Sequence, residues 1–146
     1  MTTISNDNLY SATFSEIKAF LDGISGLDPR GRYKANWIHS SMPHINQKGF
    51  DGYPFIVLKI DVNEDNNSID NSVSTKTFRI LLSIYSDDPS VVDTIAESIY
   101  NSLKSKSNLT ELKNKNLSSS PLNWDLDLNG KKISYRNIGI IGNKRI

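Results

Sequence analysis

Two histidines are the side chains in this sequence best suited to bind a metal ion or to act as a general base. His39 and His44 lie five residues apart, and Asp51 follows in the same stretch. A zinc site would need both imidazoles and a third ligand on one face, and this spacing matches no helix-borne zinc motif. We therefore expect ordinary surface or loop histidines, with no metal and no catalytic residue. A small hydrolase or metal-dependent enzyme built on these three residues is the least favoured alternative.

Carboxylates are the next group that could do chemistry, because their oxygens can coordinate Ca²⁺ or Mg²⁺. The group consists of Asp61, Glu64, Asp65 and Asp70. The order of ligands found in an EF-hand, and its glycine, are absent here. We expect a solvated hairpin loop over residues 63–71 and no metal site.

Basic and aromatic residues alternate in one segment, as they can on a surface that binds nucleic acid. The segment contains Arg30, Arg32, Tyr33, Lys34 and Trp37. Three positive charges are weak evidence, so a polar loop whose aromatic side chains anchor onto the core is the favoured interpretation. A small nucleic-acid-binding module that uses residues 30–37 stays as the alternative function.

Glycine and serine motifs for nucleotide binding or acyl transfer are absent. Residues 23–26 and 49–52 do not follow a strand and open a helix with the spacing of a phosphate loop. No G-x-S-x-G motif surrounds any serine, including Ser118, Ser119 and Ser120. The sequence therefore predicts no cofactor and a protein that is not an enzyme.

The composition indicates one folded domain over residues 1–146, with about ten flexible residues at the N-terminus. The 17 basic and 16 acidic residues leave a net charge of +1, which gives no general attraction to nucleic acid or to an anionic membrane. The absence of cysteine excludes disulfides and thiol chemistry and fits synthesis in the cytoplasm. No basic, apolar leader and no run of about 18 apolar residues occurs, so we expect no secretion by that route and no membrane span.

Two segments have apolar residues at helical spacing. The first covers residues 13–22, where Thr13 and Glu16 form the T-x-x-E pattern of a capping box. The second begins at Pro89, a residue suited to the first helical turn, and runs to about residue 105. We expect both helices to cover a sheet.

Four segments indicate strands. Residues 55–60 are an apolar run rich in β-branched side chains, and residues 77–84 alternate apolar and polar side chains. Residues 122–128 also alternate, and a return strand begins at Lys131. A further short strand near residues 35–39 and a helical turn near residues 109–113 are left open.

The last two strands are expected to form a hairpin. Asn129-Gly130 favours a two-residue type I′ turn, in which both central residues take positive φ. Asp125 and Asp127 would then face the basic side chains of the returning strand. These basic residues are Lys131, Lys132 and Arg136.

The elements together predict an α+β fold in the order α-β-β-α-β-β. Two helices would pack on a mostly antiparallel sheet that ends in the C-terminal Asn-Gly hairpin. Phe78, Ile80, Leu82 and Ile84 would face the second helix. Residues 138–142 extend an apolar stripe beyond the hairpin, which favours a partner that covers it.

Four features in a fixed order carry a resemblance to a known family. Tyr53-Pro54 precedes an apolar strand, the polar excursion at residues 63–71 follows, and the next strand ends in Ile84-Tyr85-Ser86-Asp87. The amphipathic helix of residues 91–103 comes directly after. Over residues 13–103 this arrangement resembles the tail-terminator proteins of long-tailed phages and archaeal viruses, also called tail-completion or head-to-tail joining proteins.

The resemblance implies a structural virion protein, made in the host cytoplasm and located at the head-tail junction. It would form a homo-oligomeric ring, usually hexameric, that ends the tail tube and meets the capsid neck. Its expected partners are other copies of itself, the tail tube protein and a neck or head-completion protein. DNA would pass through the lumen without specific binding, and no membrane would be involved.

Two sets of residues receive roles in such a ring. Exposed aromatic side chains would anchor neighbouring subunits to each other. The candidate anchors are Trp37, Tyr53, Phe55 and Tyr85. The acidic residues Glu64, Asp65 and Asp70 would project toward the channel or an axial partner, where they would repel passing DNA.

Overall fold

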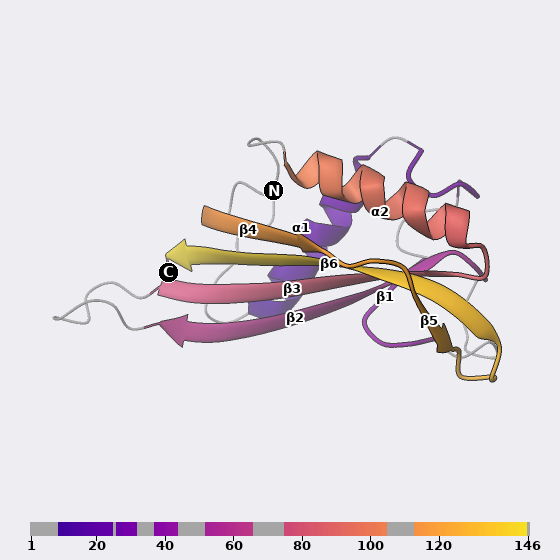
Figure 1. The fold of residues 1–146 in the computed structure, drawn as a ribbon. Coiled ribbons are helices and arrows are strands. Elements are labelled where there is room, and N and C mark those ends of the chain that lie inside the picture. The colour runs from indigo at the N-terminus through magenta and orange to yellow at the C-terminus, as the bar shows by residue number, and fades with distance from the viewer. Residues whose placement is uncertain are drawn as a thin grey trace, which may run out of the picture.

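The computed structural model describes residues 9–24, 26–31, 37–43, 52–65, 75–104 and 113–145. These residues form two helices and one mixed sheet of six strands, which confirms the predicted α+β class (Figure 1). The elements are α1 (Leu9–Asp22), β1 (Ile38–His39), β2 (Phe55–Asp65), β3 (Thr75–Ser86), α2 (Pro89–Leu103), β4 (Lys113–Ser119), β5 (Asn123–Leu126) and β6 (Lys132–Arg145). The predicted order therefore lacked two strands, β1 and β4.

The sheet has the strand order β1-β2-β3-β6-β4, and β5 also pairs with β6. Only β1 is parallel to its neighbour, and the other pairs are antiparallel. The start of β6 pairs with β3 on one side and with β5 on the other, while its later half pairs with β4. Strands β4 and β5 therefore follow each other along the same edge of β6.

Strands β2 and β3 contain the two predicted central strands and extend beyond them. Their register runs from Phe55 opposite Tyr85 to Asp65 opposite Thr75. The polar residues at the end of β2 continue the strand because a backbone ladder needs no apolar side chain. In Figure 1 the two strands project past the helices at the far end of the sheet.

Helix α1 begins four residues before the predicted start. Residues 1–8 lie outside the described part, and Leu9 and Tyr10 are already helical. Thr13 therefore lies inside the helix, where it is 1% exposed, and its Oγ1 has no hydrogen-bond partner among the described residues. The predicted capping box is wrong, because a capping residue must have a non-helical backbone.

Helix α2 confirms the second predicted helix. Asp88 is its N-cap, with an extended backbone at φ −115° and ψ 111°. The carboxylate Oδ1 accepts a hydrogen bond from the Ser90 backbone N–H at 3.0 Å and from Ser90 Oγ at 2.8 Å. A cap of this type stabilises a helix by about 1 kcal/mol.

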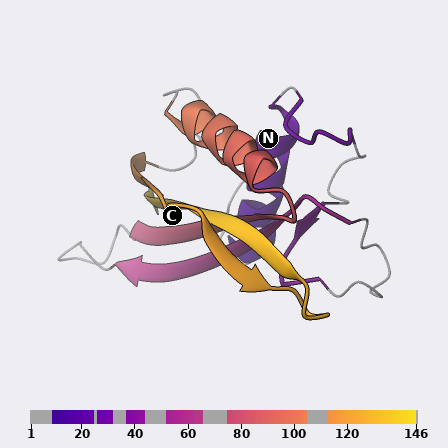
Figure 2. The same ribbon diagram turned by 45° about the vertical axis from the view of Figure 1, so that its right-hand side comes forward.

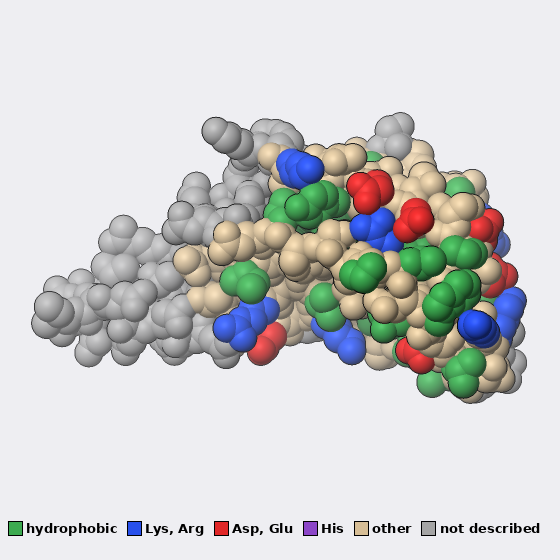
Figure 3. Space-filling view, in the orientation of Figure 1, with side chains coloured by type: hydrophobic (Ala, Val, Ile, Leu, Met, Phe, Trp, Pro, Cys, Tyr) green, Lys and Arg blue, Asp and Glu red, His purple; other side chains and the backbone are tan. Residues whose placement is uncertain are grey.

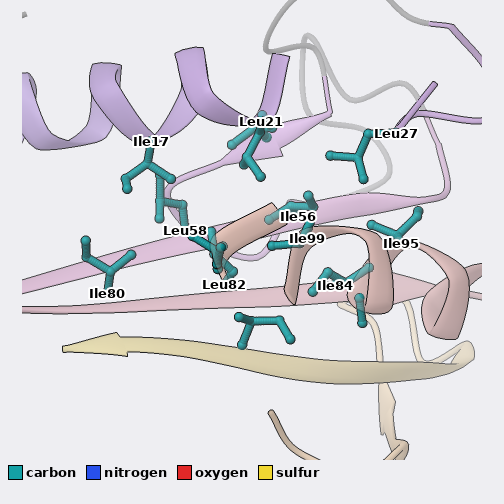
Figure 4. Packing of buried hydrophobic residues seen from close by; sticks show 14 of the residues in the cluster. Ile17, Leu21, Leu27, Ile56, Leu58, Ile80, Leu82, Ile84, Ile95 and Ile99 are labelled. Atoms are coloured by element: carbon teal, nitrogen blue, oxygen red, sulfur yellow. The ribbon is translucent and has the colours of Figure 1, made fainter. Parts of the chain in front are cut away.

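Both helices cover one face of the sheet, where the main core lies. Ile17 and Leu21 of α1 and Ile95 and Ile99 of α2 point toward the strands (Figure 4). The opposing sheet residues confirm the face predicted to meet the second helix. They are Ile56, Leu58, Phe78, Ile80, Leu82, Ile84, Ile138 and Ile140, all at most 2% exposed.

The connection from β5 to β6 differs from the predicted two-residue turn. The Asp127 N–H donates to the Lys131 carbonyl at 2.9 Å, and the Gly130 N–H donates to the Asp127 carbonyl at 3.0 Å. Gly130 has φ +82°, so residues 128–130 form a three-residue loop that ends in a left-handed glycine. The Asp127 carboxylate favours this loop by accepting the N–H groups of Asn129 and Lys131 at 2.8 and 2.9 Å.

The longer loop changes which charges meet. Asp125 lies opposite Ile133, so the two-residue side-chain period of a strand places it on the other face from Lys132 and Arg136. The predicted pairing of Asp125 with Lys132 and Arg136 is therefore wrong, whereas the charge of Lys131 does act on Asp127. Arg136 instead binds α2, with Nη1 at 3.0 Å from Glu97 Oε1 and 3.3 Å from Asp93 Oδ1.

Candidate functional site

The segment predicted as an alternative nucleic-acid surface is only partly described. Arg30 is exposed, and its Nη1 donates to the Tyr53 carbonyl at 3.3 Å. Arg32 and Lys34 lie outside the described residues. Trp37 is 3% exposed and belongs to the core, so its indole cannot stack on a base in this conformation.

The aromatic residues expected to anchor neighbouring subunits divide into two groups. Trp37 is 3% exposed and Phe55 is 1% exposed, and we assign both to the subunit's own interior. Tyr53 and Tyr85 are half-buried and keep part of their rings at the surface. Of the four predicted anchors, only these two tyrosines could contribute side-chain area to a contact between subunits.

A row of stacked rings crosses the sheet face opposite the helices. Phe55 lies between Tyr53 and Tyr85, with ring centroids 5.5 and 5.2 Å away, and Tyr135 continues the row 5.3 Å from Tyr85. His39 meets Phe55 edge-on at 5.9 Å. This row forms a second, smaller core, because the side chains of β2, β3 and β6 alternate between the two faces.

The predicted acidic loop is partly a strand. Glu64 and Asp65 belong to β2, opposite Lys76 and Thr75. Asp70 lies outside the described residues. The two described acidic residues are thus placed at the projecting end of the β2–β3 hairpin.

Histidine chemistry has little support in the described residues. His39 packs against Phe55, while His44 and Asp51 lie outside the described part. Within the described ranges no three histidine, aspartate or glutamate side chains gather closely enough to hold a metal ion. Neither helix in that part of the chain has the length and apolar character that crossing a membrane requires.

A polar cluster ties Tyr53 to the β5–β6 loop. The Tyr53 hydroxyl donates a hydrogen bond to Asp127 Oδ2. Lys131 lies beside both, with Nζ 5.2 Å from the centre of the Tyr53 ring and 3.1 Å from Asp87 Oδ2. No local pattern in the sequence indicates this contact, because it joins segments far apart in the chain.

The cluster shifts the pKa values of its two central groups in opposite directions. Burial, then the hydrogen bond to Asp127 and the negative charges of Asp127 and Asp87, raise the pKa of Tyr53. Burial alone would raise the pKa of Asp127, but the hydrogen bonds from Tyr53, Lys131 and Asn129 outweigh it and lower that pKa. The pair is therefore held as a neutral phenol donating to a carboxylate.

Three large apolar side chains are exposed at the β5–β6 end, and we call them the hairpin patch. Trp124 is 53% exposed, Leu126 59% and Leu128 55%. In Figure 2 β5 and the start of β6 extend away from α2 as a two-stranded ribbon. The alternating pattern of residues 122–128 predicted the strand, but the helix that would have covered its apolar side does not reach it.

A hollow of about 300 Å³ lies farther along the sheet, and we call it the sheet groove. Its apolar walls are Leu81, 37% exposed, and Ile141, 44% exposed, and Gly139 lies opposite Leu81 on β6. Lys59, Asp61 and Arg79 also line it. Figure 3 shows hydrophobic side chains gathered at the end of the molecule that carries β5, and smaller apolar spots beside basic side chains farther along the sheet.

Comparisons with known proteins gave no family for this chain. No family model matches the sequence, and no curated protein matches it.

Proposed function

We propose that this protein is a structural virion component that assembles into a homo-oligomeric ring at the end of a viral tail tube. The ring, expected to be hexameric, ends the tube and joins it to the capsid neck. The proposal rests on the arrangement of elements that resembles the tail-terminator family and on one structural observation. That observation is the hairpin patch, three large apolar side chains each more than half exposed.

The hairpin patch supports association because the rest of the domain already has a complete core. The sheet face beneath the helices is closed, with Ile56, Ile84 and Ile99 fully buried. The patch therefore contributes nothing to that core, and covering it in an oligomer would gain roughly 25 cal/mol for each Å² of apolar area removed from water. Exposed apolar clusters of this kind are typical of protein-protein contacts.

The shape of the molecule fits a place around a channel. The β2–β3 hairpin projects beyond the helices, and its end carries Glu64 and Asp65 (Figure 1). In the proposed ring this end points to the lumen or to an axial partner, where negative charge repels the DNA phosphates. DNA then passes without binding.

The proposal is tested with tail tubes assembled in the absence of this protein. Adding the purified protein is expected to stop tube elongation and to make the tubes competent to join filled capsids. Tubes given buffer alone should keep growing and should not join. If the tubes elongate and fail to join capsids in the presence of folded protein, the proposed tail-terminator function is contradicted.

A further inference from the structure

We propose that the hairpin patch of one copy docks into the sheet groove of the next copy, with the Trp124 indole against Leu81 and Ile141. This inference rests on the proposed ring and adds to it the two surfaces that meet. The contact is head to tail, because each copy contributes a different surface to each of its two neighbours.

The hairpin patch provides a suitable anchor. Trp124 and Leu126 are two residues apart on β5 and therefore point to the same side of the strand. Among the described strands only β6 pairs with β5, and Lys132 Nζ lies 4.8 Å from the centre of the Trp124 ring. Tryptophan is enriched among the residues that dominate binding energy, because it buries a large rigid surface.

The sheet groove provides a suitable receptor, because it is a hollow of about 300 Å³ with apolar walls. Gly139 is flanked in register by Leu81 on β3 and by Ser118 on β4. A Cβ at this position would lie 2.5 Å from Ser118 Oγ, so the Ser118 side chain lies over the glycine and forms part of the floor. Leu81 and Ile141 then offer apolar walls to an indole.

One charged pair can form across the contact. Asp61 lines the groove and is exposed. Lys132 lies opposite Leu126 and is exposed, whereas Asp125 alternates to the other face of the hairpin. A docked hairpin can therefore set Lys132 against Asp61, which fixes the orientation more than it adds affinity.

The contact has to join two copies rather than two parts of one copy. Trp124 is opposite Ser134 on β6, whereas the groove is centred near Ile140. At about 3.3 Å per residue, these points are roughly 20 Å apart along the strand. One subunit cannot fill its own groove, so both surfaces stay open until neighbours arrive.

Pairing of sheet edges is a weaker route to the same ring. The edge formed by β4 has a register shift between Lys113 and Asn116, and the outer part of β2 carries exposed Lys59 and Asp61. Bulges and charges on edge strands oppose the addition of a further strand. Side-chain docking is therefore the contact that the described surfaces favour.

The test uses two variants that each damage one surface. Trp124→Glu removes the anchor and Leu81→Glu places a charge in the groove. Asn101→Glu, at an exposed position on α2, is the matched control. Light scattering over increasing concentration is expected to show association for the wild type and the control, and monomers for each surface variant alone.

The decisive sample is the equimolar mixture of the two surface variants. The Leu81→Glu copy keeps an intact hairpin and the Trp124→Glu copy keeps an intact groove, so one sound contact can form. We expect a one-to-one dimer that grows no further. Far-UV circular dichroism and thermal melts should match the wild type, because both replaced side chains are exposed.

Failure of the docking and failure of the ring give different results. A wild type that associates while both surface variants associate equally well would overturn the docking and leave the ring. A mixture that stays monomeric beside an associating wild type would also overturn the docking. The docking and the ring would both be contradicted by two results together. The wild type would stay monomeric at every concentration, and Leu126→Cys and Ile141→Cys copies of this cysteine-free chain would form no mixed disulfide when they are oxidised together.

Discussion

At the scale of single residues, the Tyr53 hydroxyl joins two segments that are distant in the chain. It donates to Asp127, whose other carboxylate oxygen holds the β5–β6 loop through two backbone N–H groups. The loop carries Leu128 of the hairpin patch. The tyrosine thus helps to fix the surface that we propose for docking.

Tyr53→Phe is expected to lower the free energy of unfolding by about 1 kcal/mol, the typical value of one partly exposed hydrogen bond. The pKa of Asp127 should rise, because the carboxylate loses a donor. Urea unfolding and NMR titration of the carboxyl carbon measure the two effects. Tyr135→Phe is the control, because it removes a hydroxyl from the same aromatic row, and an equal loss in both variants would contradict the role of Tyr53.

The same pair predicts how stability depends on pH. The folded pKa of Tyr53 is raised, so above pH ~10 the unfolded chain releases this proton first and stability falls as pH increases. The folded pKa of Asp127 is lowered, so its contribution is present above pH ~4 and is lost as pH falls further. Thermal melts from pH 3 to 12, a range spanning roughly both model values, should show a smaller alkaline loss for Tyr53→Phe than for the wild type.

Residue type alone predicted the candidate anchors poorly. Trp37 and Phe55 have the chemistry of interface residues, but the same chemistry makes them core residues, and the structure buries them. Trp124 and Leu126 fit a strand with a buried side equally well, and the structure exposes them. The difference depends on which helix covers which strand, and that is a tertiary property.

At the scale of elements, the long periodic segments were predictable and the short polar ones were not. The helix Pro89–Leu103 and the strands Phe55–Asp65 and Thr75–Ser86 have their own apolar period. Strand Lys113–Ser119 has one large apolar residue, Leu117, and strand Ile38–His39 has two residues. Their conformation follows from hydrogen bonds to β6 and β2, and of the two only Ile38–His39 lies in a segment for which the sequence left a short strand open.

Among the contacts between elements, we expect those of Arg136 to contribute most to the stability of the fold. Its Nε donates to the Ser120 carbonyl at 2.9 Å and its Nη2 to Ser119 Oγ at 2.7 Å, while Nη1 reaches two carboxylates of α2. The side chain is 12% exposed and joins α2, β6 and the corner between β4 and β5.

Arg136→Lys is expected to destabilise the fold by about 1 to 2 kcal/mol, because an ammonium group cannot reproduce the planar set of donors. Chemical denaturation measures the loss. Arg79→Lys, which changes an exposed arginine on β3, should cost under about 0.5 kcal/mol. Similar values for the two variants would show that Arg136 contributes no more than a surface charge.

At the scale of the whole molecule, the two helices bury one face of the sheet, while two apolar surfaces remain exposed. The helix-covered face is closed, whereas the hairpin patch and the sheet groove lie open at different places along β6. In the proposed ring these two surfaces form head-to-tail contacts, and such contacts close into rings when the rotation between copies permits. The alternating pattern of residues 122–128 indicated an apolar side on this strand, but only the three-dimensional arrangement shows that Trp124 and Leu126 remain exposed.

The most direct measurement of the central claim is electron microscopy of isolated tail-tube ends carrying this protein, with image averaging to count the copies. The averaged images are expected to show a closed ring of several copies at one end of each tube, with Trp124→Glu copies failing to form it. A single bound copy, or wild-type protein spread along the tube without a ring at its end, would rule out the proposed ring.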